Sequence, residues 1–258
     1  LYANGTTRVS EPGITRDHTE RMLSGFGYPV ARQGNRVSVV GNSATLTSPG
    51  QIDIPADISS AAFFLVAAAI APGSDLLLTH VGINPSRTGV IEILRLMGAD
   101  ITLENKREVS GEPAADIRVR YTPLQGITIP EHLVPLAIDE FPVLMVTAAC
   151  ATGETVLTGA EELRVKESDR IQSMVDGLYA LGVNAIALPN GMRVQGCCDA
   201  AVFHTGTVHS HGDHRIAMAF AVAALRAQGE IRILDCANVA TSFPNFIELA
   251  HSVGLNLS

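Results

Sequence analysis

The sequence predicts an α+β protein built from a repeated unit of about 40 residues. Three segments, residues 57–98, 139–182 and 213–254, share one order: an Asp, an Ala-rich apolar run, a Gly, a short strand, an amphipathic stretch and a second Gly. The distance from the Asp to the second Gly is 41, 43 and 41 residues. Agreement this close across three copies indicates an internal repeat of α-β-α-β units.

Each copy begins with an expected buried helix followed by a short strand. The Ala-rich runs contain no internal Gly or Pro and are long enough for helices. We expect these helices at residues 61–71, 143–151 and 216–227. We expect the strands that follow at residues 76–78, 155–157 and 231–234.

The second half of a copy predicts an amphipathic helix closed by glycine. Residues 91–97 and 171–181 carry apolar side chains at helical spacing. Gly98 and Gly182 follow them directly, which is typical of a glycine C-cap that leads into a strand.

The first 30 residues match only this second half of the plan. A strand is expected at residues 5–9 and an amphipathic helix at 19–24, ending in Gly25-Phe26-Gly27. We therefore expect the chain to be the later portion of a longer repeat protein. A polar segment with Gly and Pro near Glu104–Ala115 suggests a crossing between two domains, residues 1–102 and 103–258.

Composition excludes several classes of function. The formal net charge of −8 argues against a nucleic-acid or anionic-membrane surface, although local basic residues can still bind a small anion. The four cysteines show no zinc-type spacing, so we expect free thiols in a reducing cytosol. No apolar run reaches the length of a membrane span, and the first residues do not resemble a signal peptide.

Three stretches concentrate charge just before an expected helix, at residues 10–21, 161–170 and 211–215. Arg or Lys there lies beside a helix N-terminus, where unpaired N–H groups and the dipole favour an anion. Lys166 and Arg170 share one face if the chain is helical from residue 165 onward, and a bound phosphate or carboxylate would relieve their repulsion. The alternative is a solvated charged helix face.

Three aspartates have a simpler interpretation. Asp57, Asp139 and Asp213 each open an expected helix, so N-capping alone explains their position. We expect Asp57 only to cap, and Asp139 both to cap and to take part in chemistry. His209 and His211 have the spacing of a metal-ligand pair, but no matching carboxylate or Cys accompanies them, so no metal site is expected.

The charged stretches resemble motifs of the EPSP synthase family. The segment LRVKESDR is similar to that family's LRxKES/TDR signature, TRDHTE to its SRDHTE segment and GDHRIAM to its DHRxAM segment. Three further matches, DISSAA, IDEFP and TSFP, follow the family's order. The six motifs begin at residues 15, 57, 138, 163, 212 and 241.

This resemblance implies a fold and a domain plan. Family members form an inverse α/β prism of βαβαββ units in two domains, which close on substrates held between them. The chain would lack roughly the first two and a half of six copies. Residues 1–102 would be a partial substrate-binding domain, and residues 103–258 the second domain with the two later repeats.

The resemblance also implies a reaction, the transfer of enolpyruvyl from phosphoenolpyruvate to the 5-hydroxyl of shikimate 3-phosphate with release of phosphate. Asp139 would accept the hydroxyl proton, and Glu167 would transfer a proton on the phosphoenolpyruvate side. The residues expected to bind shikimate 3-phosphate are Arg16, Ser60, Asp139 and Lys166. Those expected to bind phosphoenolpyruvate are Glu167, Arg170 and Arg215, with Asp213 and His214 as further candidates beside them.

These residue types suit that chemistry. Paired carboxylates can exchange protons with substrate when their surroundings separate their pKa values. Guanidinium groups bind carboxylate and phosphate oxygens in pairs. No cofactor or metal is required, and a full-length member is expected to be a cytoplasmic monomer.

Two other functions remain open from sequence. A sibling enzyme transfers enolpyruvyl to UDP-N-acetylglucosamine with the same fold. The chain could also be a non-catalytic fragment that binds ligand or a complementing N-terminal piece, because the family's N-terminal substrate-binding segments have no counterpart here.

Overall fold

One local arrangement occurs three times along the chain of the computed structural model, which describes residues 1–11, 13 and 15–258. Each copy is a strand, a helix and a β-hairpin. The first comprises β1 (Thr6–Ser10), α1 (His18–Gly25), β2 (Ala31–Gln33) and β3 (Arg36–Val40). The second comprises β4 (Asp75–Gly82), α3 (Gly89–Leu96), β5 (Asp100–Val109) and β6 (Glu112–Arg120). The third comprises β7 (Gly153–Leu157), α5 (Arg170–Ala180), β8 (Ala185–Leu188) and β9 (Gly191–Gly196).

The strands of each copy pair in the same way. The sheet orders are β1-β3-β2, β4-β6-β5 and β7-β9-β8, and every pair in them is antiparallel. The last strand of the hairpin is therefore always central. A fourth sheet pairs β10 (Gly206–His209) with β11 (Ile231–Leu234) in parallel. This shared topology confirms the first two predicted copies and the partial copy at the start of the chain. The third predicted copy, residues 213–254, differs: its first helix and β11 are followed by helices at 237–242 and 246–252, and no strand follows Gly254 among the described residues.

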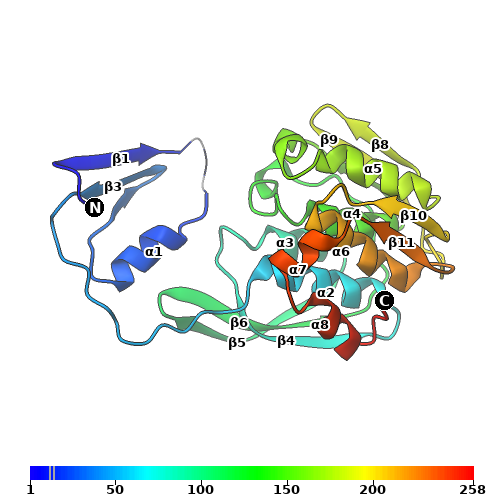
Figure 1. Cartoon of the computed structure of the whole chain (residues 1–258), viewed down its shortest axis with the longest axis horizontal. Coiled ribbons are helices and arrows are strands. Elements are labelled where there is room, and N and C mark those ends of the chain that lie inside the picture. Colours follow the sequence, from blue (N-terminus) through cyan, green and yellow to red (C-terminus); the bar gives the residue numbers. More distant parts are fainter. Residues whose placement is uncertain (12, 14) are drawn as a thin grey trace.

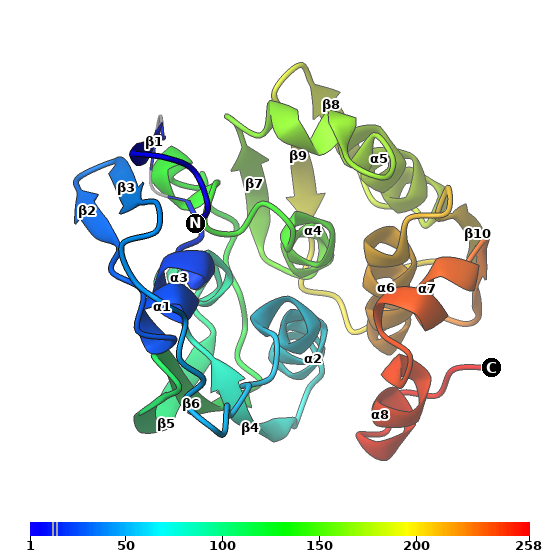
Figure 2. The same cartoon turned by 60° about the vertical axis from the view of Figure 1, so that its left-hand side comes forward.

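Three long buried helices form the centre of the larger part of the molecule. They are α2 (Ile58–Ile70), α4 (Phe141–Ala149) and α6 (His214–Ala223). Each covers most of its predicted Ala-rich run but begins two or three residues earlier. Figure 2 shows them side by side, with β4, β7, β9 and β10 outside them. The remaining elements are η1 (Glu131–Leu133), η2 (Glu161–Val165), η3 (Ala224–Arg226), α7 (Ala237–Ser242) and α8 (Phe246–Ser252).

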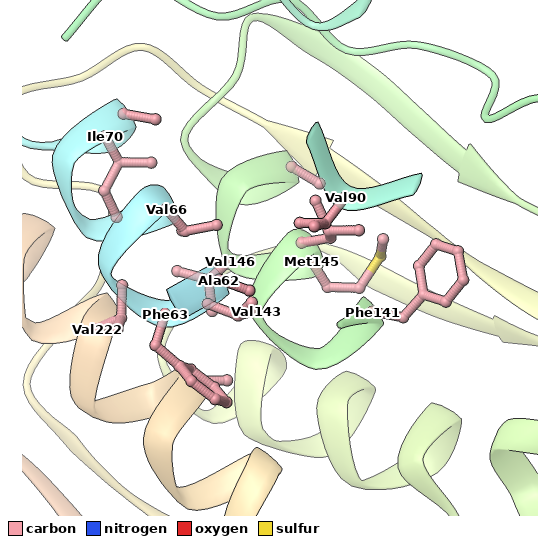
Figure 3. Close-up of a cluster of buried hydrophobic side chains, with 14 of the residues drawn as sticks. Ala62, Phe63, Val66, Ile70, Val90, Phe141, Val143, Met145, Val146 and Val222 are labelled. Atoms are coloured by element: carbon pink, nitrogen blue, oxygen red, sulfur yellow. The ribbon is translucent and has the colours of Figure 1, made fainter. Parts of the chain in front are cut away.

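The core between these helices consists of closely packed aliphatic and aromatic side chains (Figure 3). Phe63 and Val66 of α2 lie close to Val143 and Val146 of α4, and Val222 of α6 closes the cluster. Small alanines let the helices approach, and each large side chain buried here contributes about 1.5–3 kcal/mol. Other elements cover most sides of these helices, which agrees with sequences that are largely apolar rather than amphipathic; the charged exceptions, His214 and Arg215, lie in the first turn of α6.

The predicted glycine C-caps are confirmed. Gly98 and Gly182 follow the last turn of α3 and α5 with φ of +97° and +84°. After α5, the N–H of Gly182 donates to the carbonyl of Tyr179 (3.0 Å) and that of Val183 to the carbonyl of Leu178 (2.9 Å). These two hydrogen bonds turn the chain sharply out of the helix, and the turn requires a residue in the left-handed conformation.

Buried apolar side chains are distributed unevenly along the chain. A single core runs from Ile58 to Leu255, whereas Tyr28 is the only buried apolar side chain among the described residues before it. Figure 1 shows β1, β3 and α1 standing apart from this core. The expected boundary at residue 102 falls inside β5, because the polar segment 104–115 is the turn region of the β5–β6 hairpin. A division near residue 50 agrees with the packing.

Pro12 and Ile14, in the first charged stretch, lie outside the described residues. Among the helices that the structure describes, none combines the length and apolar composition that a membrane crossing requires.

Candidate active site

Four cations surround one carboxylate, that of Asp139, in the turn before α4. Arg16 donates from Nη2 to its Oδ2. Arg170 Nη1 and Lys166 Nζ lie 3.4 and 3.6 Å from its Oδ1. Arg215 places Nη2 3.9 Å from Oδ2, and its Nη1 donates to the Asp139 carbonyl oxygen (3.1 Å). Five of the predicted site residues therefore meet at one point, from segments up to 199 positions apart.

This arrangement sets the protonation state of Asp139. Burial alone raises the pKa of the carboxyl group, but the charges of Arg215, Arg16 and Lys166 outweigh it and lower the pKa to about 2. Asp139 is therefore a carboxylate at all physiological pH values. Because its side chain is only 13% exposed, water screens these interactions weakly.

Asp139 does not cap its helix. Asp57 accepts from the N–H of Ser60 (3.0 Å) and Asp213 from that of Arg215 (2.9 Å), so both cap as predicted. At α4 the N-cap position belongs to Glu140, and no side chain of the described residues makes a cap bond there. The expectation that Asp139 both caps and takes part in chemistry is wrong on the first count, which leaves its oxygens to the four cations.

Arg170 is a buried hub that joins three carboxylates. Its side chain is 1% exposed, and its Nε donates to Asp213 Oδ2 at 2.8 Å. Its other nitrogens reach Asp139 and Glu167. Asp213 is fully buried, and burial raises its pKa. The hydrogen bond and charge of Arg170, together with bonds from the Arg215 N–H and Ser168, outweigh this, so the net pKa is lowered. Glu167 remains 52% exposed, so it can meet a ligand.

Lys166 and Arg170 do not share a helix face, which corrects the expectation from their spacing. Residues 161–165 form a 3₁₀ turn, Lys166 is extended, and α5 begins only at Arg170. The reason is a local cap, since Asp169 accepts from the N–H of Gln172 (3.0 Å). In the structure the two cations flank a carboxylate of the protein itself, because both approach Asp139 Oδ1.

Two predicted residues lie at the margin of this cluster. In the described part of the chain, the Ser60 side chain hydrogen-bonds only to Asp57 Oδ2 (3.3 Å), in the first turn of α2. His214 begins α6 beside Asp213 and Arg215. Burial, and then the charge of Arg215, lowers the pKa of His214, so its ring is mainly neutral near pH 7.

Three further residues adjoin the site without having been assigned a role from sequence. Glu140 is 3% exposed and accepts from Ser59 Oγ. Arg87 donates from Nη2 to Ser59 Oγ (2.6 Å) and to Asp57 Oδ1 (3.0 Å). The repeat could have pointed to Arg87 from sequence, because Arg87 lies two residues before α3 just as Arg16 lies two residues before α1.

Residues 1–249 match the family model described as EPSP synthase (3-phosphoshikimate 1-carboxyvinyltransferase). The chain belongs to the EPSP synthase family. It is 66% identical to the 3-phosphoshikimate 1-carboxyvinyltransferase of Methylococcus capsulatus over 100% of this chain and 57% of that protein. The same enzyme of Alkalilimnicola ehrlichii is 65% identical over 100% of this chain and 57% of that protein. The chain thus spans a little over half the length of the curated relatives it matches.

Solved structures agree with this membership. An EPSP synthase from Acinetobacter baumannii, 54% identical, superimposes with a TM-score of 0.94 over 98% of this chain and 58% of its own. The enolpyruvyl transferase NikO from Streptomyces tendae, 18% identical, gives a TM-score of 0.73 over 98% of this chain and 56% of its own, which shows a shared fold. The family and fold predicted from the motifs are confirmed.

Proposed function

We propose that the protein to which this chain belongs transfers enolpyruvyl from phosphoenolpyruvate to the 5-hydroxyl of shikimate 3-phosphate in the cytoplasm, on the path to chorismate and the aromatic amino acids. The observation that carries the proposal is the convergence of Arg16, Lys166, Arg170 and Arg215 on one carboxylate. Both substrates are small polyanions, and such a cluster attracts them despite the negative net charge of the chain.

Two of the arginines around Asp139, Arg170 and Arg215, suit the carboxylate and phosphate of phosphoenolpyruvate. Arg170 and Arg215 each present several N–H donors to oxygens, in the geometry that planar oxyanions accept. In the structure these donors are satisfied by Asp139, Glu167 and Asp213. An incoming anion would therefore exchange with the more accessible protein carboxylates, while the buried Asp213 keeps Arg170 in place.

Charge exchange also explains how Asp139 could act as a base. A carboxylate with a pKa of about 2 accepts a proton poorly near pH 7. Bound phosphate and carboxylate groups would neutralise part of the surrounding positive charge and raise the pKa of Asp139. Asp139 would then take the 5-hydroxyl proton only when both substrates are present.

The second proton transfer falls to Glu167. Addition of the hydroxyl across the C=C bond requires a proton at C3 of phosphoenolpyruvate, and elimination of phosphate from the tetrahedral intermediate removes one. Glu167 has a half-exposed carboxylate bound to Arg170, within the same cluster as Asp139. Two carboxylates in unlike surroundings suit the two opposite transfers.

The remaining predicted residues complete the proposal. Arg16 and Lys166 would bind shikimate 3-phosphate together with Asp139 and, from the first turn of α2, Ser60. Asp213 would act on phosphoenolpyruvate through Arg170, since it is fully buried. His214 lies at the edge of the same cluster and would remain uncharged.

The test is phosphate release from phosphoenolpyruvate by the purified chain, with and without shikimate 3-phosphate. Release that requires shikimate 3-phosphate, and is lost in Asp139→Asn and Glu167→Gln, supports the proposal. If release is absent, calorimetric titration with each ligand shows whether the chain binds it without turning it over. Failure to bind either ligand, alone or with the segment that precedes these residues in its relatives, would refute the proposal.

A further inference from the structure

A buried carboxyl group that the proposed chemistry does not use lies beside the Arg215 guanidinium. Glu140 follows Asp139 directly, is 3% exposed, and places Oε1 3.8 Å from Arg215 Nη1. The same oxygen accepts from Ser59 Oγ, and Ser59 Oγ in turn accepts from Arg87 (2.6 Å). A buried carboxyl with these partners is expensive to maintain unless it serves the neighbouring charges.

The three side chains come from the three central helices. Ser59 lies in the first turn of α2, Glu140 at the N-cap of α4 and Arg215 in the first turn of α6. Each helix thus contributes one side chain to a connected series of contacts, from Ser59 through Glu140 to the Arg215 guanidinium. Because the helices pack through a continuous core, this series has a rigid base.

We propose that Glu140 is a positioning residue that fixes the Arg215 guanidinium for phosphoenolpyruvate, and that Ser59 and Arg87 orient Glu140 for this task. The inference rests on the proposed function, in which Arg215 binds that substrate.

The need for Glu140 follows from the exchange of charges on binding. In the structure Arg215 has two other oxygens, the Asp139 carbonyl at 3.1 Å and the Asp139 carboxylate at 3.9 Å. The carboxylate contact is the one that an anionic ligand would replace. Glu140 is shielded from solvent and ligand, so it remains to hold the guanidinium when that contact is lost. Burial raises the pKa of Glu140, and the net pKa stays raised although the hydrogen bond from Ser59 and the charges of Arg215 and Arg87 oppose this.

The experiment compares ligand binding in matched variants by calorimetric titration. Glu140→Gln keeps the size of the side chain and an acceptor for Ser59, but removes the charge. We expect it to raise the Kd for phosphoenolpyruvate about tenfold, which corresponds to about 1.4 kcal/mol. Ser59→Ala should raise it by a smaller factor. Glu92→Gln, on an exposed position of α3, is the control and should leave the Kd unchanged.

A double variant separates positioning from general damage. If Glu140 acts through Arg215, then Glu140→Gln with Arg215→Ala should have the same Kd for phosphoenolpyruvate as Arg215→Ala alone, within about twofold. Binding of shikimate 3-phosphate should change by less than about twofold in Glu140→Gln, since Arg16 and Lys166 are untouched. Multiplicative effects in the double variant, or equal weakening of both ligands, would overturn the inference.

Failure of the proposed function would be seen separately, as a wild-type chain that does not bind phosphoenolpyruvate. The coupling between Glu140 and Arg215 is then read from urea unfolding of the same four proteins: wild type, two single variants and the double variant. If the double variant changes the unfolding constant by the product of the two single-variant changes, the assigned contact between Glu140 and Arg215 is overturned. If it departs from that product, the contact is supported.

Discussion

Removing the charge of Asp139 should destabilise the folded chain and increase the affinity of the site for anions. The pKa of Asp139 lies at about 2 in the folded chain, against an ordinary value of 3.8. The difference of roughly 1.8 pH units, at about 1.36 kcal/mol each, gives about 2 kcal/mol of stability at pH 7. Asp139→Asn keeps the shape but removes the one carboxylate that Arg16, Lys166, Arg170 and Arg215 share, so we expect it to lose about this amount.

The sign of the pH dependence is specific. A folded-state pKa below the unfolded one means that the stabilisation is fully present above pH 3.8 and is lost as the pH falls toward 2. Urea unfolding between pH 7 and pH 3 should therefore show the gap between wild type and Asp139→Asn narrowing as the solution becomes more acidic. Inorganic phosphate should restore part of the stability of the variant at pH 7, and less of it in the wild type.

Asp176→Asn is a matched control, because Asp176 is an exposed residue of α5. Its unfolding free energy should stay within about 0.5 kcal/mol of wild type at every pH. A gap between wild type and Asp139→Asn that is constant from pH 7 to pH 3, or a variant as stable as wild type, would show that the four cations do not act on this carboxylate.

Three other outcomes are expected from the structure. Asp213→Asn should lower the free energy of unfolding by about 3–5 kcal/mol in urea, because it removes the charge of the fully buried carboxylate that bonds the buried Arg170 guanidinium. A loss below about 1 kcal/mol, on the order of an ordinary cap, would contradict this. Gly254→Ala should lower the free energy of unfolding by about 1–2 kcal/mol, from its φ of +90° alone. Gly182→Ala should lower it by roughly 2–4 kcal/mol, since its new Cβ would also lie 2.5 Å from a histidine ring. Equal decreases in the melting temperature of the two variants would argue against that contact. Thiol titration of the native chain with a disulfide reagent should label the three exposed cysteines and not Cys150, whose pKa burial raises to about 12; labelling of all four before unfolding would disprove the burial.

Local patterns in the sequence predicted the repeating elements well. The position of each buried helix follows from an uninterrupted apolar run, and each amphipathic helix ends where a glycine permits a left-handed residue. These features depend on residues a few positions apart, which a sequence displays directly. The polar segment at 104–115, which suggested a domain crossing from sequence, forms the end of the β5–β6 hairpin in the structure.

The three aspartates show where local reasoning ends. Asp57, Asp139 and Asp213 occupy the same position in three copies, yet two cap their helices and one does not. The difference arises from neighbours that are distant in sequence, above all the guanidinium groups that converge on Asp139. A pattern that is the same in each copy cannot distinguish positions whose surroundings differ.

The sequence by itself determined the family, the repeat and the residue types of the site, because motifs and caps are local. Only the tertiary structure decided that Arg16, Lys166, Arg170 and Arg215 meet at one carboxylate, and that Glu140 stands behind Arg215. The physical reason is that charge acts through space: the pKa of a carboxyl group depends on every cation within a few ångströms, and helix packing, not chain order, sets those distances.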